Sequence, residues 1–550
     1  MNLKAPRKMV AAAIAAAAVL FPTTARAQGE EPPERVFPIT LEEAVRRAVE
    51  HNPELAIVRL APEAEAARVG ESRSAFTPLF SATAGRSSNA TPPSNSLLGD
   101  GVDVDDWFST FVVRQRLPWG SGTWKVSWDV ARTTTNNPIS NFDLSLQSGF
   151  EIAWSQPLLK DRKVDAARHQ YAITKRNLQG SELRFRESVI QTVAAVKEAY
   201  WTLKATQANI LVQQRSLELA QELARQTKIR VDAGQVPPLD LVQAEAEVAQ
   251  RRENLIQANT IAGDAEDSLR RLIMDPGDES FWRVRLDPTE EPTAPAPLPD
   301  VDAAVARALS SRYDLARAGY ELENAQATVE FLDNQRLPDV RLETSYRGNG
   351  LGGRQYLRSG GFPGVITGTR STSLGDALAQ VFRNNYPTWS VGVTMSYPLG
   401  QSYESAGRVR AQVERRQVQQ RIASLRIEAA EAVRRAARQV RGAAERIDAA
   451  RAGAALAQER LDAEQRRYEA GLSTTFLVTQ AQRDLLQAQV NLLQTTLDYD
   501  SALVTFEAIQ QAPPLAEGDA VGVRGTTVVS LPAPSPRGVF RANGLSAFQE

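Results

Sequence analysis

The sequence lacks cysteine entirely, has only two histidines, and beyond its first 27 residues contains no long uninterrupted apolar run. The absence of cysteine excludes disulfide bonds and an acylated, lipoprotein-type N-terminus. The absence of a run of about 18 apolar residues excludes a later transmembrane helix, so any membrane crossing has to use strands.

The sequence also lacks the motifs of an enzyme. His51 and His169 lie in different segments without metal-ligand spacing, so each is expected to be a surface or packing residue. No G-x-S-x-G motif, phosphate-binding loop or paired catalytic carboxylate stands out, and the many acidic residues are typical of solvated helix faces. We therefore expect no catalytic residue, no metal and no cofactor.

The first residues have the pattern of an export signal. Lys4, Arg7 and Lys8 precede the apolar run Met9 to Phe21, and Ala25-Arg26-Ala27 offers a cleavage site. A signal peptide over 1–27 is therefore expected, with cleavage before Gln28. Its removal takes the formal net charge from -1 to about -5, a balance that argues against a nucleic-acid partner.

Two segments far apart in the chain share one helix-glycine-helix pattern. They are KIRVDAGQVPPLDLVQA, from Lys228, and RRYEAGLSTTFLVTQAQ, from Arg466. With Gly234 laid on Gly471, the residues that coincide without a gap are Ala233 and Ala470, Gln243 and Gln480, and Ala244 and Ala481. The chain therefore contains two helical hairpin tips of one kind.

The duplication extends over most of the chain. LEEAVRRAVEHNPELAIVRL, from Leu41, aligns with VDAAVARALSSRYDLARAGY, from Val301, and Pro78 then aligns with Pro338. The proline-rich segment between the halves is expected to be an extended linker. The predicted organisation is a first repeat over 28–286 (strands about 79–156, helical hairpin about 160–275, tip at 234), a linker over 287–299, a second repeat over 300–511 (strands about 339–398, hairpin about 401–511, tip at 471) and a loosely ordered tail over 512–550.

The hairpins are expected to be very long helices. No proline lies between Pro157 and Pro237, or between Pro398 and Pro513. A helix over 160–231 would be roughly 105 Å long at 1.5 Å per residue. Apolar residues then recur every seven positions, as in Leu241, Val248 and Leu255, which is typical of a coiled-coil seam. Taken alone, this periodicity favours an ordinary dimeric coiled coil.

Between the helices the apolar period changes from seven to two. Trp128, Phe150, Ile152 and Trp154 lie on the apolar faces of their segments, and the opposite faces are charged or small. This alternation predicts a transmembrane barrel with a wet lumen, although a soluble sandwich alternates in the same way. The residues expected to line the lumen are Lys125, Asp129, Glu151, Arg341 and Glu343.

The predicted strands are too few to close a barrel from one chain. Four are expected over 142–156, 389–398, 340–347 and 123–132, and two more over 79–87 and 107–117. Because bacterial barrels begin at eight strands, several chains must contribute. The sequence leaves open whether the hairpin around Gly120 and Gly122 joins the wall, which makes four or six strands per protomer. The glycine-rich segment Arg347 to Gly364 is read as an extracellular loop.

The ordered motifs HNPEL, QPLL, YPLG, VDAGQVPPLDLVQAEAE and YEAGLSTTFLVTQAQ resemble those of the TolC-like outer membrane efflux proteins. The resemblance implies a mainly helical fold with membrane strands and two internal repeats per chain. It implies a homotrimer that shares one transmembrane β-barrel, continued by a twelve-helix periplasmic tunnel. Such a trimer is a passive exit duct for drugs, metabolites or polypeptides in tripartite efflux or type I secretion, in the outer membrane of a Gram-negative-type bacterium.

The resemblance also assigns roles to the tips. The loops that would dock a periplasmic adaptor, and through it an inner-membrane transporter, are Gly234-Gln235-Val236 and Gly471-Leu472-Ser473. Many members carry acidic residues at the entrance, where this chain has Leu477 and Gln480, so an acidic gate is not expected here. A separate interpretation of the entrance is a latch in which Tyr468, near the end of one hairpin's first helix, donates a hydrogen bond to Asp240, near the start of the other hairpin's second helix. The alternative is that Asp240 stabilises its helix N-terminus and Tyr468 packs in the seam.

Two other classes of protein remain as alternatives. A non-channel trimeric coiled-coil surface or envelope-spanning protein with a membrane-embedded β end would have no need of two tips related by a repeat. A periplasmic adaptor is rich in coiled coil too, but would have one hairpin and a soluble sandwich.

Overall fold

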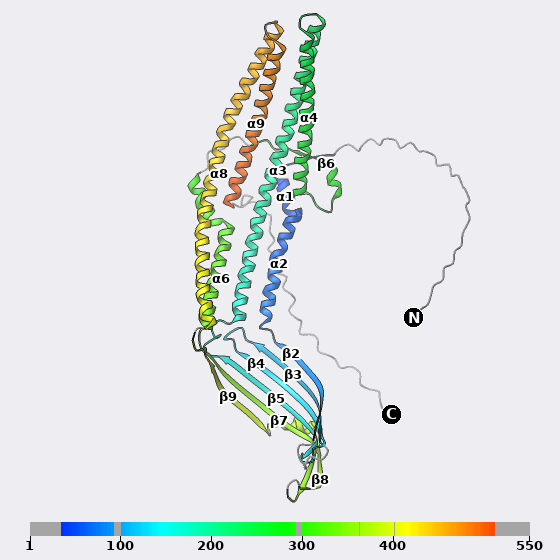
Figure 1. Ribbon diagram of the computed structural model, residues 1–550, viewed down its shortest axis with the longest axis vertical. Coiled ribbons are helices and arrows are strands. Elements are labelled where there is room, and N and C mark those ends of the chain that lie inside the picture. Colours follow the sequence, from blue (N-terminus) through cyan, green and yellow to red (C-terminus); the bar gives the residue numbers. More distant parts are fainter. Residues whose placement is uncertain (1–34, 93–100, 293–299, 362–363, 401, 512–550) are drawn as a thin grey trace, which may run out of the picture.

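The computed structural model describes residues 35–92, 101–292, 300–361, 364–400 and 402–511. The expected signal peptide, most of the expected linker and the expected tail lie outside these residues. The described chain is elongated, with long helices at one end and a β-sheet at the other (Figure 1). In the described ranges, no helix combines the length and the hydropathy needed to cross a membrane.

Two helical hairpins form most of the length. Helices α3 (Ala166–Asp232) and α8 (Tyr403–Glu469) have 67 residues each, and α4 (Pro238–Ile273) and α9 (Thr475–Gln510) have 36 each. Their long uninterrupted course follows from sequences without internal proline. Asp165 caps the start of α3 by accepting a hydrogen bond from the backbone N of Arg168 at 2.7 Å.

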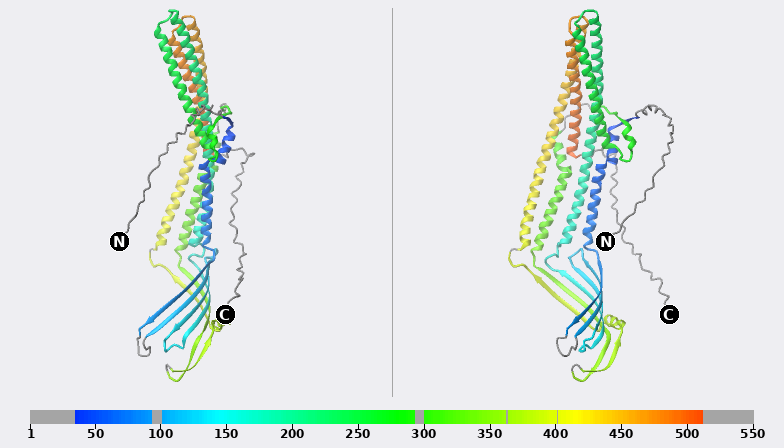
Figure 2. Two further views of the ribbon diagram at one scale, coloured as in Figure 1. Left: turned by 90° about the vertical axis from the view of Figure 1, so that its right-hand side faces the viewer. Right: turned by 45° about the vertical axis from the view of Figure 1, so that its right-hand side comes forward.

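Two shorter helices extend the hairpins toward the sheet, α2 (Pro53–Ser74) below α4 and α6 (Tyr313–Gln335) below α9 (Figure 1). Helix α2 packs on α3, and α6 packs on α3 and α8. At the first junction, the Asn52 side chain accepts from the backbone N of Leu55 at 3.0 Å and donates to the carbonyl of Leu272 at 3.1 Å. The helices therefore form one curved layer, called the helical wall below (Figures 1 and 2). Across its width the order of the helices is α8, α9, α3, α4 in the half near the tips and α8, α6, α3, α2 in the half near the sheet.

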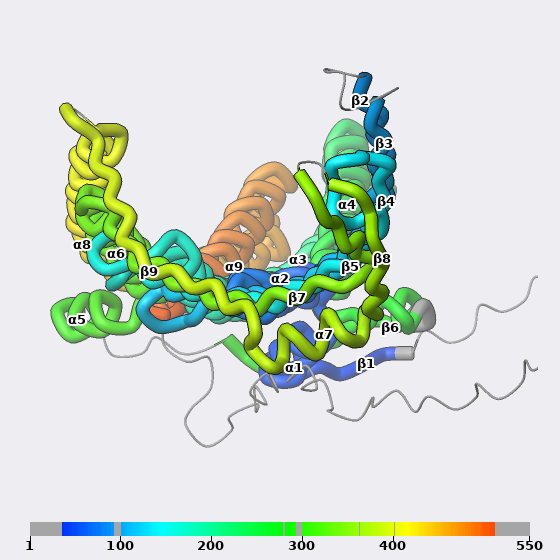
Figure 3. Tube along the Cα trace, turned by 90° about the horizontal axis from the view of Figure 1, so that it is seen from below, coloured from blue at the N-terminus to red at the C-terminus, as the bar shows by residue number. Residues whose placement is uncertain are grey.

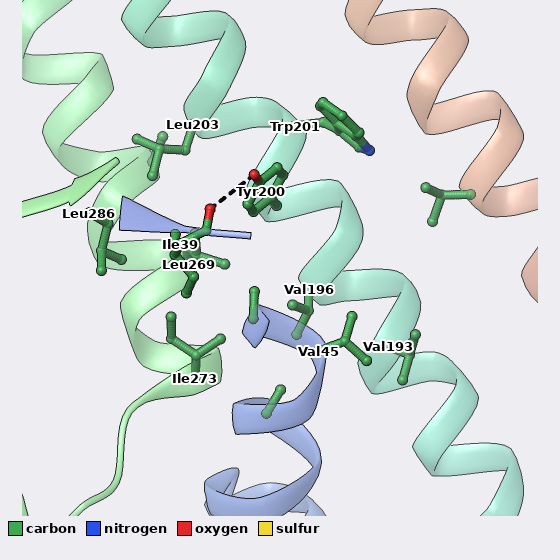
Figure 4. Close-up of a cluster of buried hydrophobic side chains, with 14 of the residues drawn as sticks. Ile39, Val45, Val193, Val196, Tyr200, Trp201, Leu203, Leu269, Ile273 and Leu286 are labelled. Carbon is green, nitrogen blue, oxygen red and sulfur yellow. Dashed lines mark hydrogen bonds between the residues drawn. The ribbon is translucent and has the colours of Figure 1, made fainter. Parts of the chain in front are cut away.

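A small unit packs on the outside of this wall at mid-length. Helix α1 (Leu41–His51), the parallel strands β1 (Arg35–Ile39) and β6 (Val284–Pro288), and the turn η1 (Glu279–Arg283) share a buried core with α3 and α4. Within it the hydroxyl of Tyr200 donates to the carbonyl of Ile39 at 3.1 Å (Figure 4). Helix α5 (Val301–Ser311) packs on α8 in a second core.

The sheet is antiparallel, and six of its strands lie side by side. Their order is β2 (Leu79–Thr91), β3 (Val102–Arg116), β4 (Thr123–Thr135), β5 (Phe142–Pro157), β7 (Asp339–Ser359) and β9 (Pro387–Ser396). Strand β9 pairs with the first half of β7, and β8 (Val365–Thr372) pairs with its far end. The hairpin whose place the sequence left open therefore lies between β2 and β5, in the plane of the sheet.

The prediction that Arg347 to Gly364 is a loop is wrong for Arg347–Ser359, because β7 continues through these residues. The glycines there permit close packing. Helix α7 (Leu374–Phe382) lies on β7, and a Cβ on Gly350 would stand 1.9 Å from the carbonyl oxygen of Ala377. Gly348 and Gly352, on the same face, also approach α7 backbone or its N-cap. The glycines therefore belong to a strand that a helix covers.

Candidate functional site

The predicted lining residues share one face of a curved sheet. Viewed along the long axis, the sheet is an arc, and α7 lies on its convex side (Figure 3). Because α7 packs on the even-numbered glycines of β7, the odd-numbered residues of that strand lie on the concave face. The register then places the whole predicted set on the concave face, namely Lys125, Asp129, Glu151, Arg341 and Glu343.

Ion pairs run across this concave face, between the neighbouring strands β4 and β5, between β4 and β7 across β5, and around Arg341 at the helix end of β7. The Lys125 ammonium lies 2.9 Å from the Glu151 carboxylate, and Arg347 donates to Asp129 at 2.7 Å. Arg341 pairs with Asp339 at 2.8 Å and with Asp161 at 3.2 Å. Because charges of both signs alternate, the face is polar without being strongly cationic or anionic.

Sequence reasoning missed Arg347, which it had placed in a loop. The signal was present, because the alternation of Arg341, Glu343 and Ser345 continues to Arg347 two residues later. The opposite, convex face carries the predicted apolar set. There the rings of Phe111 and Trp128 lie 5.6 Å apart on paired strands.

The two hairpin tips lie together at the end remote from the sheet (Figure 1). Gly234 and Gly471 have φ of 70° and 73°, the left-handed conformation that favours glycine after a helix. The residue after each glycine closes its turn. The backbone N–H of Gln235 donates to the carbonyl of Arg230, and that of Leu472 donates to the carbonyl of Arg467, each at 2.8 Å. Leu472 is 80 % exposed. Both tips are thus hydrogen-bonded turns, and the second presents the apolar side chain of Leu472 to solvent.

The structure does not form the predicted pair of Tyr468 with Asp240. The hydroxyl of Tyr468 lies 3.2 Å from Oγ1 of Thr227 and 3.3 Å from Oγ1 of Thr475, and the residue is 2 % exposed. Asp240 lies in the first turn of α4. Within one chain the end of α3, and not the start of α4, faces Tyr468, so the latch stays a prediction that this structure does not test. The packing alternative describes what is observed.

A group of charged residues that the sequence reasoning did not single out joins the two hairpins a few turns from the tips. The carboxylate of Glu247 on α4, 5 % exposed, accepts from Nε of Arg483 on α9 at 3.1 Å and also pairs with Arg251. Burial opposes ionisation of Glu247, but the hydrogen bond from Arg483 and the charge of Arg251 outweigh it, so its pKa lies below the usual value. The sequence signal was the charged Arg251 in a row where alanine otherwise recurs every seven residues, at Ala244, Ala258 and Ala265.

The predicted entrance residues lie on α9 near this group. Leu477 is exposed, and Gln480 donates to Asp484 at 2.7 Å. The His169 ring stacks on the Phe331 ring, with 4.7 Å between the ring centres. His51 lies at the surface, where its Nδ1 is 3.8 Å from a carboxylate oxygen of Asp275. Among the described residues, no group of three or more His, Cys, Asp or Glu side chains is arranged to hold a metal ion.

Comparison with known proteins gives one consistent answer. The sequence profile of the family described as "Outer membrane efflux protein" matches residues 44–273 and 304–509. The outer membrane efflux protein BepC of Brucella suis biovar 1 (strain 1330) is 26% identical over 369 residues, which are 66% of this chain and 70% of BepC.

Solved structures share the fold. A membrane protein from Pseudomonas aeruginosa aligns with a TM-score of 0.62 and 16% identity, over 86% of this chain and 92% of that one. The outer membrane channel CmeC of Campylobacter jejuni aligns with a TM-score of 0.61 and 16% identity, over 86% of this chain and 85% of that one.

Proposed function

The chain belongs to the family of outer membrane efflux proteins, and we propose that three copies of it assemble into one closed duct. Its function is that of an outer membrane exit duct of a tripartite efflux system. The proposed trimer is a shared transmembrane barrel continued by a twelve-helix periplasmic tunnel, and each chain contributes two structural repeats, over 28–286 and 300–511.

The edges of the chain carry this proposal. Strands β2 and β9 lie at the two ends of the sheet, and every residue of β9 is exposed. Each edge strand leaves one row of backbone groups unpaired, which is costly in a membrane. Pairing β9 of one copy with β2 of the next satisfies both rows and closes the barrel.

The helical edges support the same assembly. Helices α4 and α8 lie at opposite edges of the wall near the tips (Figure 1). Each presents exposed apolar residues two heptads apart, Val242 and Ile256 near the tip end of α4, and Val413 and Ile427 near the sheet end of α8, where the opposite edge of the wall is α2 with exposed Ile57 and Leu60. Stripes with this spacing suit a coiled-coil contact with a neighbouring copy.

The two ends of the duct have different tasks. Lys125, Asp129, Glu151, Arg341 and Glu343 line the barrel bore, and the convex aromatic face meets outer membrane lipid. The tip loops Gly234-Gln235-Val236 and Gly471-Leu472-Ser473 dock a periplasmic adaptor that connects to an inner-membrane transporter. Leu477 and Gln480 line the entrance. Residues 1–27 direct export, and the mature N-terminus is not acylated.

Assembly is tested by native mass spectrometry of the detergent-solubilised protein. The expected species is a trimer, and a stable folded monomer would rule out the duct. Docking is tested in cells with a photo-crosslinking residue at Leu472. It should capture a periplasmic adaptor, whereas the same residue at Leu399, which is even more exposed but lies between sheet and helices, should not. Equal capture at both positions would overturn the tip assignment.

A further inference from the structure

The two halves of the chain contribute unequally to the sheet. The first half supplies β2, β3, β4 and β5, whereas the second supplies only β7 and β9 along the wall. The β3–β4 hairpin separates β2 from β5, and its pairing with both is continuous, from Leu79 with Arg114 to Thr91 with Val102, and from Thr123 with Ser155 to Thr134 with Leu144.

We propose that this hairpin makes the barrel wider, so that the closed trimer contains eighteen strands, and that the outlet passes cargo as broad as the helical tunnel admits. The inference rests on the trimeric duct proposed above. Without the β3–β4 hairpin, the chain would supply four strands and the trimer twelve.

The hairpin is fixed to the rest of the protein at its helix-proximal turn. Ser121, in that turn, is buried and donates to the carbonyl of Asp161 at 2.7 Å. It also bonds to Asp165, the N-cap of α3, and accepts from Arg168 at 2.6 Å. Gln156 on β5 donates to the carbonyl of Gly120 at 2.8 Å. These contacts tie the turn to the base of the helical wall.

The faces of the hairpin match those of the neighbouring strands. On the convex side the rings of Phe111 and Trp128 are in contact, tilted by 31°, and Trp128 stands opposite Phe150 of β5. On the concave side Lys125 and Ser127 both reach Glu151 of β5. The hairpin therefore continues both the apolar and the polar surface, as a wall segment must.

Six strands also match the helical wall in width. Strands about 4.8 Å apart and tilted by about 40° occupy roughly 6.3 Å each along the circumference. Six strands then span roughly 38 Å, and four would span roughly 25 Å. Four helices packed 8–10 Å apart span about 32–40 Å. The barrel of six-stranded protomers thus continues the tunnel without narrowing.

This width has a consequence for cargo. Barrels of sixteen to eighteen strands leave an open aqueous channel. The concave face is lined by opposite charges in pairs, Lys125 with Glu151 and Asp129 with Arg347, so it favours neither sign strongly. The barrel therefore suits bulky, hydrated, polar cargo, including polypeptide segments, and selection by size occurs at the tips.

The direct test is a cryo-EM map of the full-length trimer in lipid nanodiscs. Eighteen wall strands are expected. A closed barrel of twelve strands, with the β3–β4 hairpin outside the wall, would overturn this inference and leave the duct intact. A sheet that remains open, or a monomer, would instead overturn the proposed function.

A cysteine pair gives an independent result, because the native chain has no cysteine. Ala84 and Ser109 are opposite partners on β2 and β3. With Ala84→Cys and Ser109→Cys together, oxidation of assembled trimers should form a disulfide within each chain, and Ala84→Cys alone should form none. Trimers in which the pair stays reduced would show that β3 does not lie beside β2, and would overturn the inference.

Discussion

The hydroxyl of Tyr468 lies 3.2 Å from Oγ1 of Thr227, which joins the last turns of α8 and α3 just before their tips. The Arg230 guanidinium stands 4.0 Å from the centre of the Tyr468 ring and donates to the Tyr468 carbonyl at 2.8 Å. Thr227 is fully buried. The two hairpins of one chain are thus held together by a small buried polar contact at the entrance.

Tyr468→Phe should loosen the entrance. It removes the hydroxyl and leaves the buried Thr227 and Thr475 hydroxyls without this partner, at a cost of about 1–3 kcal/mol per chain. We expect a lower melting temperature and more frequent channel openings in single-channel recordings. Asp240→Asn is the matched comparison and should keep the openings of the parent. If Asp240→Asn opens the channel as readily, the Tyr468 contact is not what restrains the entrance.

Asp500 on α9 should make stability depend on pH. It is 4 % exposed, and burial raises its pKa from the ordinary 3.8 to about 6. A carboxyl whose folded pKa is raised stabilises the folded state below the unfolded pKa. That contribution is lost as the pH rises from about 4 to about 6, and a shift of about two units corresponds to about 3 kcal/mol per chain at most.

Asp500→Asn should therefore raise the melting temperature above pH 6 and flatten its change between pH 4 and pH 6. Asp498→Asn serves as the control, because Asp498 is half-buried and pairs with Arg446 at 3.0 Å. It should lower the melting temperature slightly or leave it unchanged. Parallel pH profiles for the parent and Asp500→Asn would refute the assignment.

Gly350→Ala should displace α7. The added Cβ would meet the Ala377 carbonyl at 1.9 Å, and such overpacking costs about 1–3 kcal/mol. Limited proteolysis should then cut within 373–386 faster than in the parent. Gly392→Ala on β9, where nothing lies within 4 Å of the new Cβ, should leave the cleavage rate unchanged. Equal rates for both variants would mean that α7 is not held by contact with Gly350.

Single cysteines should distinguish the two faces of the sheet. The expected pattern is that Lys125→Cys and Glu151→Cys react with a charged, membrane-impermeant thiol reagent, because the proposed trimer places them in the bore. Trp128→Cys and Ile152→Cys should be shielded by lipid in the reconstituted protein. The rates are measured by mass shift over time. The opposite order of rates would reverse the assignment of the concave face as the lumen.

Local sequence patterns predict the helices well, because they depend on few distant contacts. The absence of proline, a seven-residue period and Gly234 and Gly471 indicate two long hairpins with tight tips. The alternation of apolar and polar residues with a period of two indicates the strands. It also predicts that Lys125 and Glu151 lie on the same face of the sheet.

The features that the sequence did not predict depend on contacts between segments that are distant in the chain. The glycines after Arg347 looked like a loop because nothing in their neighbourhood shows that α7, a helix of nine residues, will cover them. The partner of Tyr468 depends on how two supercoiled hairpins are rotated relative to each other. That rotation brings Thr227, and not Asp240, beside the phenol. The pairing of Glu247 with Arg483 depends on the same arrangement.

The most direct test of the duct is the current that the purified trimer carries across a planar lipid bilayer. Discrete, ohmic current steps are expected from the parent, with larger or longer steps from Tyr468→Phe because its entrance is loosened. The steps should show weak selectivity between cations and anions, given the paired charges of the bore. If inserted trimers of both proteins pass no current, the chain does not form a conducting duct.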